Sequence, residues 1–326
     1  MIPQIVIAML LGFAVFMCGM KLMELALHRL AGPQLLRLVR QSTATPLHGL
    51  AVGAASSAVL QSSTAVTVIS IGLVNAGLLT FPRTLGIILG TNIGTCLTTE
   101  LIGLNIQQMA APLLAASFGA WLLTALVKEF GLLPRLAGLK WLEPVRSASV
   151  AVCGFGLLLA GLSIMQSIGP AVQETGLFAW FLDQAEASIW WGLGAGAALT
   201  AAVHSSSAVI GLVMGFVSIG AMPVELGVAI VLGANVGTCA TALLASIGGS
   251  KGGQLVAVSH TLLNIGGALL FMPLIGELAA VSGWLAHSAS SQIAHAQTIF
   301  NVVCSLIALP LCYLKPLRNI EAADPR

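Results

Sequence analysis

The sequence has very few charged residues. Only 13 Lys and Arg and 11 Asp and Glu occur among 326 residues, or 7%, whereas soluble domains contain about 25%. Hydrophobic residues make up 57% of the chain, and the mean hydropathy is +0.99. This composition excludes an ordinary soluble domain, and we expect no nucleic-acid partner. Apolar segments of about 20 residues recur along most of the chain, which predicts an all-α polytopic protein in the lipid bilayer.

Cysteine pairs with metal-binding or redox spacing are also absent. The six cysteines lie in apolar segments without CxxC or Cys/His patterns, so we expect buried free thiols. The first apolar segment, from about Ile5 to Met23, has no Lys or Arg before it and no small-residue cleavage site after it. We therefore expect a retained transmembrane helix rather than a signal peptide.

One polar pattern occurs twice in this apolar chain. The first copy reads QSSTA at 61–65 and GTNIGTC at 90–96; the second reads HSSSA at 204–208 and GANVGTC at 233–239. Gln61 and His204 lie 143 residues apart, as do Asn92 and Asn235. Because two clusters keep one internal distance in both copies, the pattern predicts a single two-part site.

The charges that follow the first helix of each copy have opposite signs. The stretch 24–41, which we interpret as an interfacial helix, carries Arg29, Arg37 and Arg40; its counterpart, 166–188, carries Glu174, Asp183 and Glu186 and no Lys or Arg. Since Lys and Arg near helix ends favour the cytoplasmic side, the two copies are expected to lie in opposite orientations.

The predicted architecture therefore has two inverted-topology repeats, each with a re-entrant helical hairpin and a broken transmembrane helix. We expect seven crossings of the cell inner (plasma) membrane, with the N-terminus outside and the C-terminus cytoplasmic; full crossing by the hairpin arms stays an alternative. The predicted crossings are about 5–23, 84–103, 109–128, 148–166, 225–247, 251–273 and 293–314, and the hairpins are about 45–79 and 189–221. The chain then divides into repeat 1 (5–128), a cytoplasmic linker (129–147), repeat 2 (148–273), an outer loop with the final helix (274–314) and a cytoplasmic tail (315–326).

The hydroxyl clusters fall at the predicted turns of the hairpins. Non-helical backbone is tolerated at membrane depth only where it lines a cavity or is buried in protein. A half-helix that begins at Ser62 would point free N–H groups into the protein, and such a helix N-terminus is suited to an anion. The inverted copy brings its own serines to the same depth, which favours a tetrahedral oxyanion.

The repeat cores contain no Lys or Arg to balance that anion. Bound cations must do so, and sodium, held by hydroxyls and by carbonyls of interrupted helices, is the natural candidate. The Gly/Asn clusters are predicted to be those interruptions. The candidate anion-binding residues are Gln61, Ser62, Ser63, Thr64, His204, Ser205, Ser206 and Ser207; the candidate sodium-binding residues are Thr91, Asn92, Thr95, Asn235 and Thr238.

Close helix packing is the competing explanation for a single serine run, because small residues also line membrane helix interfaces. Duplication at one offset favours the site instead. For two further pairs, His260 with Asn264 and Gln297 with Asn301, interhelical hydrogen bonding is the favoured interpretation, since each pair lies four residues apart on one helix face.

At these motifs the chain resembles the bacterial branch of the type II sodium/phosphate cotransporter family. That family has two inverted repeats, each with a Q-S-S-S type hairpin followed by a G-x-N-x-G-T segment. The resemblance implies sodium-coupled symport of inorganic phosphate by alternating access, with no enzymatic cofactor and sodium as the coupling ion. His204 stands where the family has Gln, and Thr64 stands where Ser is usual. Some bacterial relatives carry a cytoplasmic regulatory domain after the last helix, and we expect no such domain here.

Two other functions stay open at this point. A proton-coupled or efflux carrier for phosphate or another oxyanion would use His204 as its titrating group. A membrane-embedded serine hydrolase would pair Ser63 with His204, but neither hairpin core supplies the Asp or Glu that a triad needs. The sequence does not indicate the oligomeric state, the sodium stoichiometry or the direction of flux.

Overall fold

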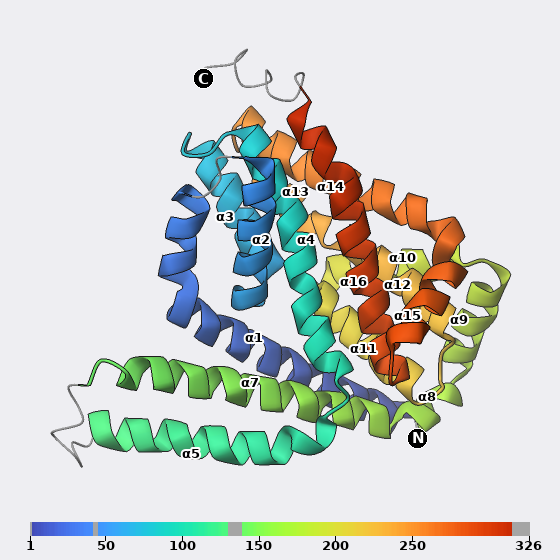
Figure 1. Ribbon diagram of the computed structural model, residues 1–326. Coiled ribbons are helices and arrows are strands. Elements are labelled where there is room, and N and C mark those ends of the chain that lie inside the picture. The colour runs from blue at the N-terminus through green and yellow to red at the C-terminus, as the bar shows by residue number, and fades with distance from the viewer. Residues whose placement is uncertain (1, 42–44, 130–138, 315–326) are drawn as a thin grey trace. The chain divides into compact units, whose positions relative to one another are not determined.

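The computed structural model describes residues 2–41, 45–129 and 139–314. Within these ranges every regular element is a helix, and no strand occurs (Figure 1). The predicted all-α polytopic fold is therefore confirmed at this level. Residues 130–138 of the predicted linker and the whole predicted tail lie outside the described residues.

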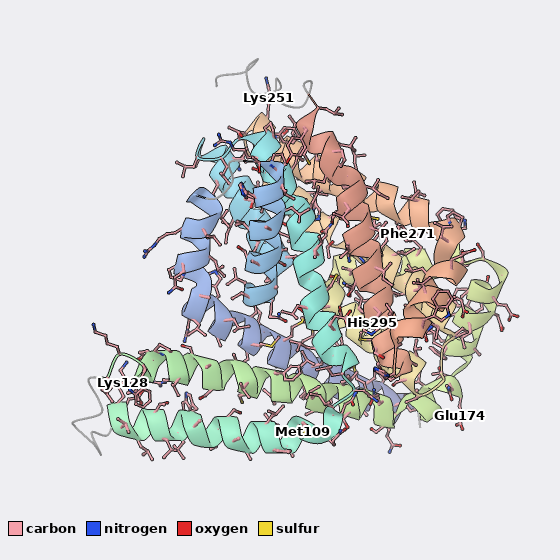
Figure 2. All side chains as sticks on the ribbon, in the orientation of Figure 1. Met109, Lys128, Glu174, Lys251, Phe271 and His295 are labelled. Atoms are coloured by element: carbon pink, nitrogen blue, oxygen red, sulfur yellow. The ribbon has the colours of Figure 1, made fainter. Side chains whose placement is uncertain are left out.

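The helices follow one another with short connections. They are α1 (Ile2–Gln41), α2 (Pro46–Leu60), α3 (Ser63–Asn75), α4 (Phe81–Gly103), η1 (Gln107–Met109), α5 (Ala110–Lys128), α7 (Leu142–Ser167), α8 (Gly169–Gln173), α9 (Gly176–Ala187), α10 (Trp190–Val203), α11 (Ser206–Ser218), α12 (Val224–Gly237), α13 (Cys239–Ser246), α14 (Lys251–Phe271), η2 (Met272–Leu274), α15 (Ile275–Leu285), α16 (Ala289–Ala308) and η3 (Leu309–Tyr313). Figure 2 labels Lys251 and Phe271, which mark the two ends of α14.

Seven helical segments in the described residues are long and apolar enough to cross a membrane, as predicted. They are Gln4–Val39, Phe81–Gly103, Gln107–Lys128, Leu142–Ser167, Val224–Ser246, Lys251–Leu285 and Ala289–Tyr313. Four shorter apolar helices, α2, α3, α10 and α11, have 13 to 15 residues. At 1.5 Å per residue each extends only about 20 Å, too short for a hydrocarbon core of about 30 Å. They form the two helical hairpins at the predicted positions.

Internal contacts divide the chain into two compact units that interleave in sequence. Unit 1 consists of Met1–Gln34 and Ile106–Val172, and unit 2 of Leu35–Asn105 and Gln173–Arg326. Unit 1 contains α5, α7 and most of α1, whereas unit 2 contains both hairpins. All thirteen candidate site residues therefore lie in unit 2.

The first helix is longer than the sequence predicted. We expected a crossing that ends near Met23 and a separate interfacial helix after it, but α1 runs without interruption to Gln41. Apolar residues continue past the expected end, and Ala26 and Val39 are both buried. Because the apolar stripe continues, nothing in the sequence stops the helix at Met23, and Arg29 and Arg37 extend from it as exposed side chains.

The predicted break in the first Gly/Asn motif is wrong, because α4 is continuous from Phe81 to Gly103. Its glycines serve close packing instead: a Cβ on Gly90 would overlap the carbonyl oxygen of Leu50 in α2, and one on Gly94 would overlap that of Ala54. In the second copy an interruption does occur, at Thr238 between α12 and α13.

Glycines bring the hairpin arms into backbone contact with the long helices of unit 2. The hairpin arm α2 packs on α4, and α10 packs on α12, so the two copies use the same kind of interface. In α10, a Cβ on Gly196 would overlap the carbonyl oxygen of Ile230, while a Cβ on Gly194 would meet nothing within 4 Å. These contacts fix the position of each hairpin turn.

The pair Gly196 and Gly194 allows a matched test of this packing. We expect Gly196→Ala to lower the free energy of unfolding by about 1–3 kcal/mol, since the new methyl group overpacks the interface. Gly194→Ala should leave it unchanged or raise it by up to about 1 kcal/mol through helix propensity. Thermal unfolding of the detergent-solubilised protein measures both, and equal melting temperatures for the two variants would contradict the close packing.

Candidate functional site

The two hairpin turns have the same backbone geometry. Gln61 ends α2 with φ of 54°, and His204 ends α10 with φ of 59°. The residues that follow are extended, with φ of −151° at Ser62 and −150° at Ser205. A left-handed conformation is unfavourable for residues other than glycine and concentrates at functional sites. Both copies adopt it at the first residue of the duplicated pattern.

Each serine cluster begins a helix, as predicted. The hydroxyl oxygen of Ser62 accepts a hydrogen bond from the backbone N–H of Ala65 at 3.3 Å, and that of Ser205 accepts one from Ala208 at 3.3 Å. The first N–H groups of α3 and α11 have no acceptor within their own helices. Each turn therefore presents backbone donors together with hydroxyl groups, the combination that binds anions at helix N-termini.

A small cavity joins the first turn to residues of the second copy. It has a volume of about 10 Å³ and is lined by Ser63, Thr64 and Thr67 of α3, Thr238 and Ala242 at α13, and His260 of α14. This volume suits one sphere of the size of a water molecule. The candidate residues Ser63, Thr64 and Thr238 thus meet at one cavity within unit 2.

Two polar atoms in the lining of this cavity are unsatisfied. Thr67 Oγ1 and His260 Nδ1 are buried and have no hydrogen-bond partner among the described residues. A buried polar group without a partner costs about 1–3 kcal/mol, so a ligand at this position would supply the partners that these two atoms lack. Thr67 was not among the predicted site residues, although its hydroxyl lies one helical turn after Ser63. For His260, the sequence favoured interhelical hydrogen bonding over ligand contact.

The second turn contacts the same short helix. Nδ1 of His204 lies 3.0 Å from Oγ1 of Thr241, and the His204 side chain is otherwise exposed. Thr241 lies on α13 next to Ala242, three residues after Thr238. Both hairpin turns therefore contact α13, which makes this helix the link between the two copies of the pattern.

The other candidate sodium residues bond mainly within their own helices. Thr91 Oγ1 donates to the carbonyl of Ile88 and Thr95 Oγ1 to that of Thr91, each at 2.8 Å. In the second copy, Asn235 Nδ2 donates to the carbonyl of Val231 at 2.9 Å. Among the five, Thr238 alone lines the small cavity.

Interhelical hydrogen bonding is confirmed for Asn264 and Gln297, but not for His260, whose Nδ1 has no partner among the described residues. Asn264 Oδ1 in α14 accepts from Asn92 Nδ2 of α4 at 3.4 Å. In the other pair, Gln297 Oε1 of α16 accepts a short hydrogen bond from Thr99 Oγ1 of α4. These bonds place α14 and α16 against α4, next to the first Gly/Asn motif.

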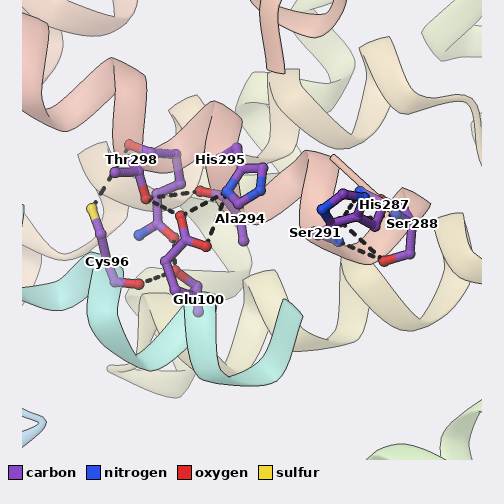
Figure 3. Close-up of polar contacts among 10 residues, drawn as sticks. Cys96, Glu100, His287, Ser288, Ser291, Ala294, His295 and Thr298 are labelled. Carbon is purple, nitrogen blue, oxygen red and sulfur yellow. Dashed lines mark hydrogen bonds and ion pairs between the residues drawn. The ribbon is translucent and has the colours of Figure 1, made fainter. Parts of the chain in front are cut away.

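A carboxylate and an imidazole meet further along the same interface (Figure 3). Glu100 of α4 accepts from the hydroxyl of Thr298 at 2.5 Å, and His295 Nδ1 lies 3.0 Å from its other carboxylate oxygen. Both side chains of this ion pair are partly exposed. The pair lies in unit 2, outside the hairpin turns.

The sequence of the chain is similar to one protein family and to several known proteins. The family model described as Na+/Pi-cotransporter matches residues 15–167 and 174–308. YqeW of Bacillus subtilis (strain 168), an uncharacterized protein, is 31% identical over 299 residues, covering 92% of each chain. YjbB of Escherichia coli (strain K12), named as a candidate inorganic phosphate export protein, is 23% identical over 303 residues. That match covers 93% of this chain but 53% of YjbB, so the chain spans about half the length of that relative.

A shorter part of the chain is similar to a human protein. Sodium-dependent phosphate transport protein 2B of Homo sapiens is 32% identical over 99 residues, which cover 29% of this chain and 14% of that protein. No solved structure matches the chain.

The unsatisfied hydroxyl of Thr67 can be tested against a satisfied one in the same helix. In potassium buffer without phosphate, we expect Thr67→Val to raise the free energy of unfolding by up to about 1 kcal/mol, since valine keeps the shape and removes an unpaired group. Ser70→Ala should lower it by about 1 kcal/mol, because Ser70 Oγ donates to the carbonyl of Val66 at 2.7 Å. Thermal unfolding distinguishes the two, and destabilisation by both variants would show that Thr67 has a protein partner.

Proposed function

Because the chain belongs to the Na+/Pi-cotransporter family, we propose that it is a secondary active transporter that moves inorganic phosphate across the membrane together with sodium. It is a transport protein and not an enzyme. The observation that carries the sodium-coupled proposal is the small cavity at which Ser63 and Thr64 of one copy meet Thr238 of the other, beside the unpaired atoms of Thr67 and His260.

Phosphate binding is assigned to the two hairpin turns. The N-termini of α3 and α11 supply backbone N–H donors, and Ser62 to Thr64 and Ser205 to Ser207 add hydroxyl groups. Gln61 and His204 complete the two turns. None of the four hairpin helices contains Lys, Arg, Asp or Glu, so phosphate would be held by dipoles alone and its charge would need a bound cation.

Sodium is the cation that fits this environment best. The cavity offers hydroxyl oxygens and room for one small ion, and oxygen donors at interrupted helices are typical of sodium sites in transporters. Thr238 lies at the α12–α13 interruption and takes part directly. Thr91, Asn92, Thr95 and Asn235 would then act by holding α4 and α12 around the cavity.

The proposed mechanism is alternating access between two inverted repeats. The matching φ angles of Gln61 and His204 and the matching caps of Ser62 and Ser205 support a duplicated unit, and the opposite charges around the two copies support its inversion. All proposed ligands lie in unit 2. The site can therefore stay assembled while access to it changes. We place the chain in the inner (plasma) membrane with its N-terminus outside and its C-terminus cytoplasmic.

Uptake of labelled phosphate into proteoliposomes tests the coupling. We expect uptake to require an inward sodium gradient and to be lost when potassium replaces sodium. Ser206→Ala should abolish uptake, because Ser206 is the first residue of α11, whereas Ser218→Ala at the other end of that helix should retain it. Thr67→Val should raise the sodium concentration needed for half-maximal uptake. Equal uptake in sodium and potassium would refute sodium coupling.

A proton-coupled or exporting carrier is the second candidate. The exposed imidazole of His204 at the second turn and the contact of His295 with Glu100 favour it, because histidine side chains commonly carry protons in proteins. The name of YjbB, which refers to phosphate export, points in the same direction for efflux.

His204→Gln separates the two candidates. Because Gln61 occupies the corresponding turn with nearly the same φ, we expect the variant to keep sodium-driven uptake with the pH profile of the parent. If His204 carries a coupling proton instead, the variant will transport at a rate that no longer responds to a pH gradient. Uptake measured in fixed sodium at several values of pH, with and without a pH gradient across the membrane, decides between these outcomes.

A further inference from the structure

Unit 1 contains a groove that opens where two helices separate. Helices α1 and α7 run antiparallel and touch through glycines: a Cβ on Gly12 would lie 3.1 Å from the carbonyl oxygen of Gly161, and a Cβ on Gly154 would lie 2.5 Å from the backbone nitrogen of Met23. Past Met23 and Gly154 the two helices no longer meet through glycine. A cavity of about 630 Å³ lies there, lined by residues of both helices and by Trp121 of α5.

The lining of this groove changes from apolar to charged along its length. Leu22 and Leu25 of α1 and Val150 of α7 lie nearest to the glycine crossing, and Arg29 and Arg146 lie further along the same two helices. The residues from α1 are spaced three or four apart and therefore share one helix face. The groove thus has an apolar inner part and a basic mouth.

The mouth carries one cation in excess. Arg146 pairs with Glu129 at 2.8 Å, and its guanidinium carbon lies 5.8 Å from the ring centroid of Trp121. Glu143 is paired with Lys128, which Figure 2 labels at the end of α5. Arg29 has no ion-pair partner among the described residues, so its charge is available to an anion at the groove.

We propose that this groove binds one anionic phospholipid. Its phosphate would contact Arg29 and Arg146, and its acyl chains would lie along Leu22, Leu25 and Val150. Cavities of roughly 300–1,000 Å³ hold ligands of this order of size, and basic pockets between membrane helices bind anionic headgroups on the cytoplasmic side. The proposal is independent of phosphate transport, because it uses unit 1 alone.

A free phosphate ion would share the headgroup chemistry but would leave the leucine-lined part of the groove empty. The lipid is therefore the occupant that satisfies both parts. This difference gives the experiment its two arms: an anionic lipid against a zwitterionic lipid with the same chains, and the lipid against inorganic phosphate.

Native mass spectrometry of the full chain in detergent, with equal amounts of phosphatidylglycerol and phosphatidylcholine, tests the proposal. We expect one phosphatidylglycerol to be retained preferentially. Arg29→Gln should lower its occupancy about fivefold, the loss expected for one cation–headgroup contact. Arg83→Gln, which removes an exposed cation from unit 2, should leave it unchanged. Leu25→Trp, which fills the apolar part, should also lower occupancy while Arg29 is intact.

Three results would overturn the proposal. Equal retention of the two lipids would exclude headgroup recognition. Equal occupancy in Arg29→Gln and Arg83→Gln would exclude this groove as the binding place. Displacement of the lipid by millimolar inorganic phosphate would identify a free-anion site instead. Because Arg29 is exposed and unpaired, its variant is expected to fold, and a melting temperature equal to that of the parent verifies this.

Discussion

The need to satisfy backbone polar groups away from water controls this structure. A helix that stops within an apolar chain leaves its first N–H groups and its last carbonyls without partners, and each unmet group in hydrocarbon costs several kcal/mol. Both hairpins stop helices in this way. The left-handed residue at each turn closes one helix, and the serine that follows caps the next. The first N–H groups of α3 and α11 remain without partners within their own helices, so the same constraint leaves hydrogen-bond donors at both turns.

Glycine packing determines where those turns lie. The short arms α2 and α10 have little surface of their own, and they touch α4 and α12 through backbone atoms. Gly90 and Gly94 make these backbone contacts in the first copy, and Gly196 and Gly233 make them in the second. The glycines of the Gly/Asn motif thus support the hairpin of the same copy. This explains why the two clusters keep a fixed distance in sequence.

Some features followed directly from local sequence. Seven apolar segments, two hairpins and a helix start within the first serine cluster depend on composition and capping, which act over a few residues, and all were predicted. The predicted start at Ser62 differs by one residue from the observed start at Ser63, because Ser62 caps the helix. The break at Gly90 was predicted wrongly, because glycine beside Asn is equally compatible with a kink and with a close contact. Only the neighbouring helix decides between them. The meeting of Thr67 with His260 could not be predicted for a related reason, since 193 residues separate them and only tertiary packing brings them to one cavity.

The division into two units could not be predicted either, and it changes how the duplicated pattern is understood. Each of the two repeats that the sequence predicts would contribute to both units, because α1 and α5 lie within the first predicted repeat and most of α7 lies within the second. Unit 1 therefore gathers the helices without polar motifs, and unit 2 gathers every polar motif. If transport separated the residues that bind phosphate and sodium, we would expect these residues to be divided between the two units. Because all the proposed ligands belong to unit 2, the proposed mechanism would change access to an intact site and would not rebuild the site in each cycle.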